Sequence, residues 1–232
     1  MVDLHTHMLY EVDDGAKTMD EAFSMLEIAS SLGMHTICLT PHKSSYRKYA
    51  KSSDLWQDRF LVLKDYIKKR QLKIHLVLGS EVDEDDHIIE NAKEGYTLNH
   101  TPYILIDFMM RNADVSEVIY NLKVLGYKVI IAHPERVEQL EFEDLVQLKK
   151  EGALLQVSSN HLVGLGKSRC QKMAKKLLKH DLIDVISSDA HDTNDLLTMK
   201  DAYAYVSKKK GVKIANQLFN DKPLEILKAS RK

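Results

Sequence analysis

Short apolar runs recur along the chain, and each is followed by a stretch whose apolar residues are spaced three or four apart. Seven of these runs are rich in β-branched and aliphatic residues and are bounded by polar or turn residues, which is the pattern of buried strands. They span residues 2–7, 36–40, 74–79, 103–108, 128–132, 154–158 and 183–187. We predict a strand at each of these ranges.

The stretches between the runs carry helical signals. Thr18 and Glu21 form a T-x-x-E capping box, apolar residues then recur at helical spacing, and Gly33 marks the end. The same spacing returns over residues 56–67 and 115–125. From residue 198 onward the sequence predicts two or three further helices, the last of them beginning near Pro223.

The alternation of buried strand and amphipathic helix predicts an α/β fold. Strands that are apolar on both faces need helices on both sides, as in a parallel sheet. The absence of a linker between the seven units favours one closed or nearly closed TIM-like barrel, with residues 1–232 as a single domain. A doubly wound open sheet is the alternative.

Composition excludes several functional classes. The 33 basic and 34 acidic residues nearly cancel, so no global field attracts nucleic acid or an anionic membrane, and a nuclease or polymerase-associated module is disfavoured. No apolar run approaches the roughly 20 residues that span a bilayer, and no secretory leader is recognisable. We therefore expect a cytoplasmic protein. The two cysteines do not suggest a disulfide framework.

Polar and ionisable side chains stand at the end of every predicted strand. In a parallel barrel these ends converge at one mouth, where active sites lie. His5 and His7 are two apart on an extended segment, so both can face one cation. With Glu81 and Asp189 they make a nitrogen and oxygen donor set without thiolate, which suits Mn²⁺, Fe²⁺ or Zn²⁺. Crowding these groups without a cation would be costly.

Other histidines and acids near these positions have weaker claims. His161 follows the sixth strand and is expected either behind the ligands or facing a substrate. Asp13 and Glu11 are expected in solvent or behind the ligands. The remaining histidines are expected at the surface, namely His35, His75, His87, His100 and His180.

The order of these motifs resembles the PHP (polymerase and histidinol phosphatase) superfamily. The segments D-L-H-T-H, T-P-H, A-H-P-E-R and S-D-A-H occur in that order. Within this superfamily, the stretch V-D-D-G-A-K-T resembles the corresponding sequence of the bacterial tyrosine-phosphatase branch. That branch includes the CpsB and YwqE proteins of capsule and exopolysaccharide loci. The resemblance covers nearly the whole chain.

The resemblance implies a distorted (β/α)7 barrel with three metal ions, usually manganese, at the C-terminal face. It implies a first ion held by His5, His7, Glu81 and Asp189. Glu81 would bridge to a second ion held by Asp107 and His133, and a third ion would be held by Asp14, His42 and His191. The family usually has Glu at the position of Asp107, so the ligand here is shorter by about 1.5 Å. Gly15 is expected to permit the tight turn that returns Asp14 to the barrel.

The resemblance also implies a mechanism. Grouped divalent ions turn a bridging water into a hydroxide that attacks phosphorus, so no protein nucleophile is needed. Neither Cys38 nor Cys170 precedes an Arg at the C-x5-R spacing of cysteine-dependent phosphatases. Arg136 is expected to hold the phosphate through its planar fork. Family members commonly carry a second Arg after S-D-A-H, which this chain lacks, and Lys200 or Arg47 could replace it.

The function implied is a manganese-dependent protein-tyrosine phosphatase acting on the tyrosine-rich tail of a bacterial tyrosine autokinase. A first alternative is a histidinol-phosphate phosphatase or another small phosphomonoesterase of the superfamily. A second is a non-catalytic, metal-binding regulator that docks onto the kinase. The absence of the second Arg keeps this second alternative open.

Overall fold

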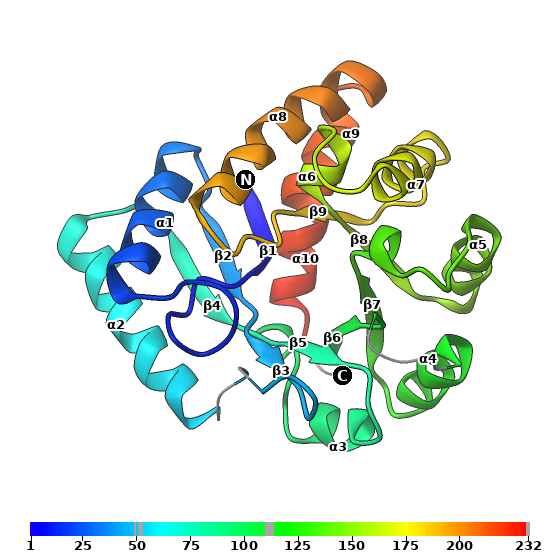
Figure 1. Ribbon diagram of the computed structural model, residues 1–232, viewed down its shortest axis with the longest axis horizontal. Helices are drawn as coiled ribbons and strands as arrows, with labels where there is room; N and C mark the ends of the chain where they lie inside the picture. Colours follow the sequence, from blue (N-terminus) through cyan, green and yellow to red (C-terminus); the bar gives the residue numbers. More distant parts are fainter. Residues whose placement is uncertain (49, 51–52, 110–113, 231–232) are drawn as a thin grey trace.

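The computed structural model describes residues 1–48, 50, 53–109 and 114–230, and it has the predicted α/β architecture with parallel strands (Figure 1). Every ladder between named strands is parallel, and the strands follow one another around a ring. The strands are β1 (Val2–Thr6), β2 (Thr36–Leu39), β3 (His42–Lys43), β4 (His75–Leu78), β5 (Glu81–Asp83), β6 (Tyr103–Asp107), β7 (Lys128–Ala132), β8 (Leu154–Ser158) and β9 (Val185–Ser187).

The second and third predicted strands are observed as β2 and β4, and each is followed by a further short strand outside its predicted range. β2 and β4 pair with β1 in a three-stranded sheet, whereas their continuations β3 and β5 join a six-stranded sheet that runs on to β9. A bridge between Thr6 and Ala190 connects the first sheet to the end of the second. The seven predicted strands therefore form a distorted seven-stranded barrel, and the open-sheet alternative is wrong. β3 and β5 were not predicted, because strands of two and three residues are too short to show an alternating pattern.

Helices surround this ring (Figure 1). The capping box is confirmed at α1, where the Thr18 side chain accepts a hydrogen bond from the Glu21 amide. The short α3 and α6 were not predicted, because they are too short to show a helical period. The helices are α1 (Met19–Ser31), α2 (Asp54–Arg70), α3 (Ile88–Lys93), α4 (Val115–Val124), α5 (Phe142–Glu151), α6 (Ser159–Leu162), α7 (Ser168–Lys179), α8 (Thr193–Lys210), α9 (Val212–Asn216) and α10 (Lys222–Lys228), with the shorter turns η1 (Leu98–His100), η2 (Pro134–Arg136) and η3 (Gln217–Asp221).

Two apolar clusters stabilise the barrel. The larger one lies between the strands and the surrounding helices. The smaller one contains residues from strands all around the ring, such as Leu4, Leu105 and Ile130, together with Ile226 and Leu227 of α10. α10 also contacts β1 and η1, so the last helix closes the end of the barrel at which the strands begin. No helix in the described ranges is both long enough and apolar enough to cross a membrane.

Candidate metal centre

The nine predicted ligands lie together at the opposite end of the barrel, where the strands finish. Their nitrogen and oxygen atoms form four overlapping groups, and within each group the atoms lie within 4.8 Å of one another. One group contains His5, His7 and Glu81, and another contains Glu81, Asp107 and His133. The other two are His5 with His133 and Asp189, and His7 with Asp14, His42 and His191.

The rings of His5 and His7 are oriented by hydrogen bonds at their far sides. His5 Nδ1 lies 2.9 Å from Gln156 Oε1, and His7 Nδ1 lies 2.8 Å from Asp13 Oδ2. The His133 amide also donates to Gln156 Oε1, which identifies that atom as an acceptor. Both Nδ1 atoms therefore carry a hydrogen, and in the neutral rings both Nε2 atoms present lone pairs. These two Nε2 atoms are 3.2 Å apart, a repulsive arrangement that a cation between them would relieve.

Glu81 lies at the centre of the imidazoles. Its Oε2 is 3.4 Å from His5 Nε2, 3.3 Å from His7 Nε2 and 3.0 Å from His42 Nδ1. Its Oε1 is 2.8 Å from His133 Nε2. Burial raises the pKa of Glu81, but the surrounding imidazoles outweigh it and hold the pKa well below its ordinary value. The carboxylate is therefore ionised and faces two ligand groups at once, as a bridging ligand would.

The ligand group that contains Asp14, His42 and His191 depends on a tight turn after β1. Asp14 Oδ1 lies 3.4 Å from His42 Nε2 and 3.4 Å from His191 Nε2. A Cβ at Gly15 would lie only 1.9 Å from the carbonyl oxygen of His7, so any side chain there would push the turn away from the strand. The expected role of Gly15 is confirmed, and its cause is the close backbone approach.

Two of the predicted ligands have left-handed backbone conformations. His133 has φ 31° and Asp189 has φ 54°, a region that non-glycine residues rarely adopt. The Asp189 amide donates to the His5 carbonyl oxygen at 3.0 Å, which holds that strained residue against β1. Strain of this kind persists only where the surrounding structure enforces it, and it concentrates at functional sites.

Asp107 reaches the second ligand group despite its short side chain. Its neighbour is Arg47, from the loop after β3, whose Nη2 lies 2.5 Å from Asp107 Oδ2. The same guanidinium donates from Nε to Asp83 Oδ2 at 2.9 Å. Arg47 thus contacts the mouth of the barrel, whereas Lys200 is exposed and lines a different cavity beside Met1. Of these two candidates for the second phosphate-binding cation, Arg47 is the one near the site.

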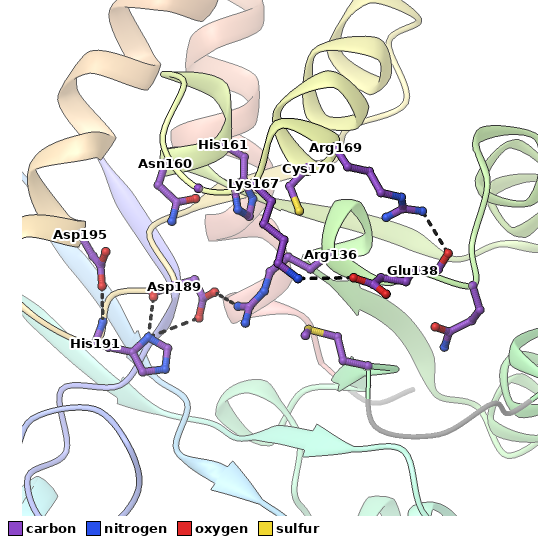
Figure 2. A pocket seen from close by; sticks show the side chains of 13 residues that line it. Arg136, Glu138, Asn160, His161, Lys167, Arg169, Cys170, Asp189, His191 and Asp195 are labelled. Carbon is purple, nitrogen blue, oxygen red and sulfur yellow. Dashed lines mark hydrogen bonds and ion pairs between the residues drawn. The ribbon is translucent and has the colours of Figure 1, made fainter.

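A cavity of about 520 Å³ opens beside the ligand groups (Figure 2). Arg136, the predicted phosphate-binding residue, lies at its wall and donates from Nη1 to Asp189 Oδ2 at 2.9 Å. The cavity joins the edge of the metal-ligand cluster to basic and polar side chains outside it. It is lined by Met109, Arg136, Glu138, Gln139, Asn160, His161, Gly166, Lys167, Arg169, Cys170, Asp189, His191 and Asp195.

The residues with weaker claims divide as predicted. Asp13 is buried behind His7, and Glu11 is exposed and pairs with Arg59 at 3.1 Å. His161 is buried and lines the cavity. The other five histidines are exposed, namely His35, His75, His87, His100 and His180.

Gln156 and Glu135 are buried polar residues of the site that the sequence alone did not identify. Gln156 orients His5 from the apolar strand β8, and an amide within an apolar run was the available signal. Glu135 lies in the A-H-P-E-R motif and is completely buried. Gln156 contacts the predicted ligand His5, whereas Glu135 contacts His161 and the Ser158 amide, and no motif spacing reveals these contacts.

A parallel barrel with imidazoles and carboxylates grouped at its C-terminal mouth is the architecture of a metal-dependent hydrolase. The chain belongs to the CpsB/CapC family of capsular polysaccharide synthesis, whose model matches residues 1–228. This confirms the resemblance to the CpsB and YwqE branch.

Individual relatives agree with this assignment. The chain is 32% identical to CapC of Staphylococcus aureus over 234 residues, which cover 97% of this chain and 84% of that one. It is 28% identical to the tyrosine-protein phosphatase CpsB of Streptococcus agalactiae, with 98% of each chain covered. A crystal structure from a study of YwqE from Bacillus subtilis and CpsB from Streptococcus pneumoniae, described as metal-dependent tyrosine phosphatases, superposes with a TM-score of 0.89 at 26% identity and covers 99% of this chain and 95% of that one.

Proposed function

We propose that the chain is a manganese-dependent protein-tyrosine phosphatase, with residues 1–232 acting as one domain in the cytoplasm. The observation that carries this proposal is the convergence of nine nitrogen- and oxygen-bearing side chains beside a cavity that also contains Arg136. The tyrosine-phosphatase names of the relatives support phosphotyrosine as the substrate class. The capsule-synthesis family supports a bacterial tyrosine autokinase as the partner.

The donor set suits Mn²⁺, with Fe²⁺ or Zn²⁺ as alternatives, because it combines imidazole with carboxylate and lacks thiolate. Because the four ligand groups overlap, together they would hold three ions, with Glu81 shared between two of these ions. Bound divalent ions would supply the Lewis acidity that activates water and neutralises phosphoryl oxygens. Asp13 and Gln156 orient the imidazoles, and Arg136, which lines the cavity, would bind the phosphate.

The test compares substrates on the purified chain with and without Mn²⁺. We expect phosphate release from a phosphotyrosine peptide in the presence of Mn²⁺ and none after chelation. Replacing Arg136 with Lys should weaken substrate binding, because a point charge cannot reproduce the bidentate fork. Exposed Arg70→Lys is the matched control. A strong preference for histidinol phosphate at equal concentration would contradict the proposed substrate, and kinase binding without any phosphate release would favour the regulator.

A further inference from the structure

A buried histidine–glutamate pair forms part of the wall of the cavity. His161 of α6 donates from Nδ1 to Glu135 Oε1 at 2.8 Å, and the Ser158 amide donates to the same oxygen at 2.9 Å. His161 is 6% exposed and Glu135 is 0% exposed. These two hydrogen bonds fix the carboxylate, and the carboxylate in turn fixes the tautomer and the orientation of the imidazole.

The opposite edge of the His161 ring is turned toward the cavity. Within the described ranges, Nε2 of His161 makes no hydrogen bond. Gly166 packs on this edge with φ +75°, and a Cβ there would lie 2.9 Å from Nε2. A side chain at position 166 would therefore cover Nε2, whereas glycine leaves it accessible. Figure 2 shows His161 beside Asn160 on one side of the pocket, with Arg136 and Asp189 below them.

The pair has no place among the predicted metal ligands. None of the ligand groups within the described residues includes His161 or Glu135. Glu135 Oε2 is buried without a hydrogen-bond partner, which is a costly arrangement for a carboxylate that serves only packing. A buried carboxylate that orients an imidazole at the wall of a catalytic cavity is the arrangement of an acid–base pair.

We propose that His161 is a catalytic residue that protonates the phenolic oxygen of the leaving tyrosine, with Glu135 as its positioning residue. The proposal rests on the phosphotyrosine phosphatase function proposed above. Water adds its oxygen to phosphorus, the bond between phosphorus and the phenolic oxygen breaks, and its electron pair stays on that oxygen. The acid is the imidazolium form of His161, which keeps its Nδ1 hydrogen on Glu135 and carries a second hydrogen on Nε2. The Nε2 proton passes to the oxygen, so tyrosine leaves as a neutral phenol and the ring is left as the neutral imidazole. The attacking water loses one proton, and a proton returned to Nε2 restores the imidazolium for the next turnover.

The need for such an acid depends on the leaving group. The pKa of a tyrosine phenol is about 10, so expelling it as a phenolate is slow. A p-nitrophenolate leaves readily without a proton, because the nitro group stabilises its charge. General acid catalysis typically contributes about 10²–10⁴-fold to a rate. A residue that donates this proton therefore affects poor leaving groups far more than good ones.

The experiment measures kcat for phenyl phosphate and for p-nitrophenyl phosphate with the Mn²⁺-loaded full chain. For His161→Gln we expect kcat on phenyl phosphate to fall about 100-fold and kcat on p-nitrophenyl phosphate to fall less than about 5-fold. Glu135→Gln should show the same selective loss to a smaller extent, because a neutral amide still accepts from His161. The same substitution at exposed His180 should change neither rate.

Two further measurements separate catalysis from structure. Metal content and the affinity for a non-hydrolysable phosphonate analogue of phosphotyrosine should be unchanged in both variants. Equal losses on the two substrates, or no loss on either, would show that the pair only braces the loop and would overturn the proposal. A wild-type chain inactive on both substrates would contradict the proposed function itself, whereas an active wild type with unselective variants contradicts only the role of His161.

Discussion

The two ends of the barrel are built from the same strands but bury opposite kinds of side chain. At the end closed by α10, Leu4, Leu105 and Ile226 belong to an apolar cluster that needs no ligand. At the open end, Glu81 and Asp189 are buried among imidazoles. Apolar burial stabilises a fold by about 25 cal/mol per Å², whereas buried charges cost free energy unless they are paired. The closed end therefore supplies stability and the open end supplies chemistry.

Removing a ligand at the open end should have the largest effect. We expect Asp189→Ala and His42→Ala each to lower Mn²⁺-dependent phosphatase activity by about 10³-fold, because several kcal/mol of charge stabilisation are lost at about 1.36 kcal/mol per factor of ten. Activity is measured as phosphate release from a phosphotyrosine peptide. His87→Ala, at an exposed position, is the control. Full activity in either ligand variant would contradict the claim that the open end of the barrel supplies the chemistry.

Truncating a side chain at the closed end should lower the stability of the fold and leave the phosphatase activity unchanged. Ile226→Ala leaves a cavity under the barrel and should lower the free energy of unfolding by about 2–5 kcal/mol, as measured by urea denaturation. Activity per folded molecule should be unchanged. Lys228→Ala on the same helix is exposed and should cost little. A large loss of specific activity in folded Ile226→Ala would show that the two ends are coupled.

Residues behind the ligands should have an intermediate effect. Asp13→Asn weakens the hydrogen bond that orients His7, and we expect metal affinity to fall about 10–100-fold, as is usual for such supporting groups. Competition with a fluorescent chelator measures this affinity. Glu11→Gln in the same loop is the matched control, since Glu11 is exposed. Equal metal affinities in the two variants would contradict a role for Asp13 in orienting a metal ligand.

The smallest effect expected is a pH dependence of the difference between the Tm with Mn²⁺ and the Tm with chelator. Burial lowers the pKa of His42, but Glu81 and Asp14 outweigh it and raise the pKa to about 9. In the metal-free protein the protonated ring stabilises the fold in full below its ordinary pKa of about 6.5, and this contribution is lost as pH rises through about 9. Metal binding requires the unprotonated ring and strengthens over the same range.

The gap between the Tm with Mn²⁺ and the Tm with chelator should therefore widen from pH 6.5 to 9. Differential scanning fluorimetry at matched ionic strength measures both values. A gap that is constant or narrows with rising pH would contradict the placement of His42 in the metal centre.

The sequence was sufficient to predict the barrel, because each strand is a continuous apolar run and each polar strand end must converge at one mouth. It was insufficient for the short strands β3 and β5, which carry His42 and Glu81. It also missed Gln156 and Glu135, because orientation through a second residue depends on contacts across the barrel. The Arg47 contact with Asp107 joins residues 60 apart in the chain, and only folding brings them together.

The most direct test is anomalous X-ray diffraction from crystals of the Mn²⁺-loaded chain, recorded on both sides of the manganese absorption edge. We predict manganese peaks enclosed by the grouped side chains of His5, Glu81, Asp189 and their partners, with Glu81 contacting more than one ion. Peaks confined to exposed histidines such as His87 and His180, with none inside the barrel mouth, would contradict this prediction.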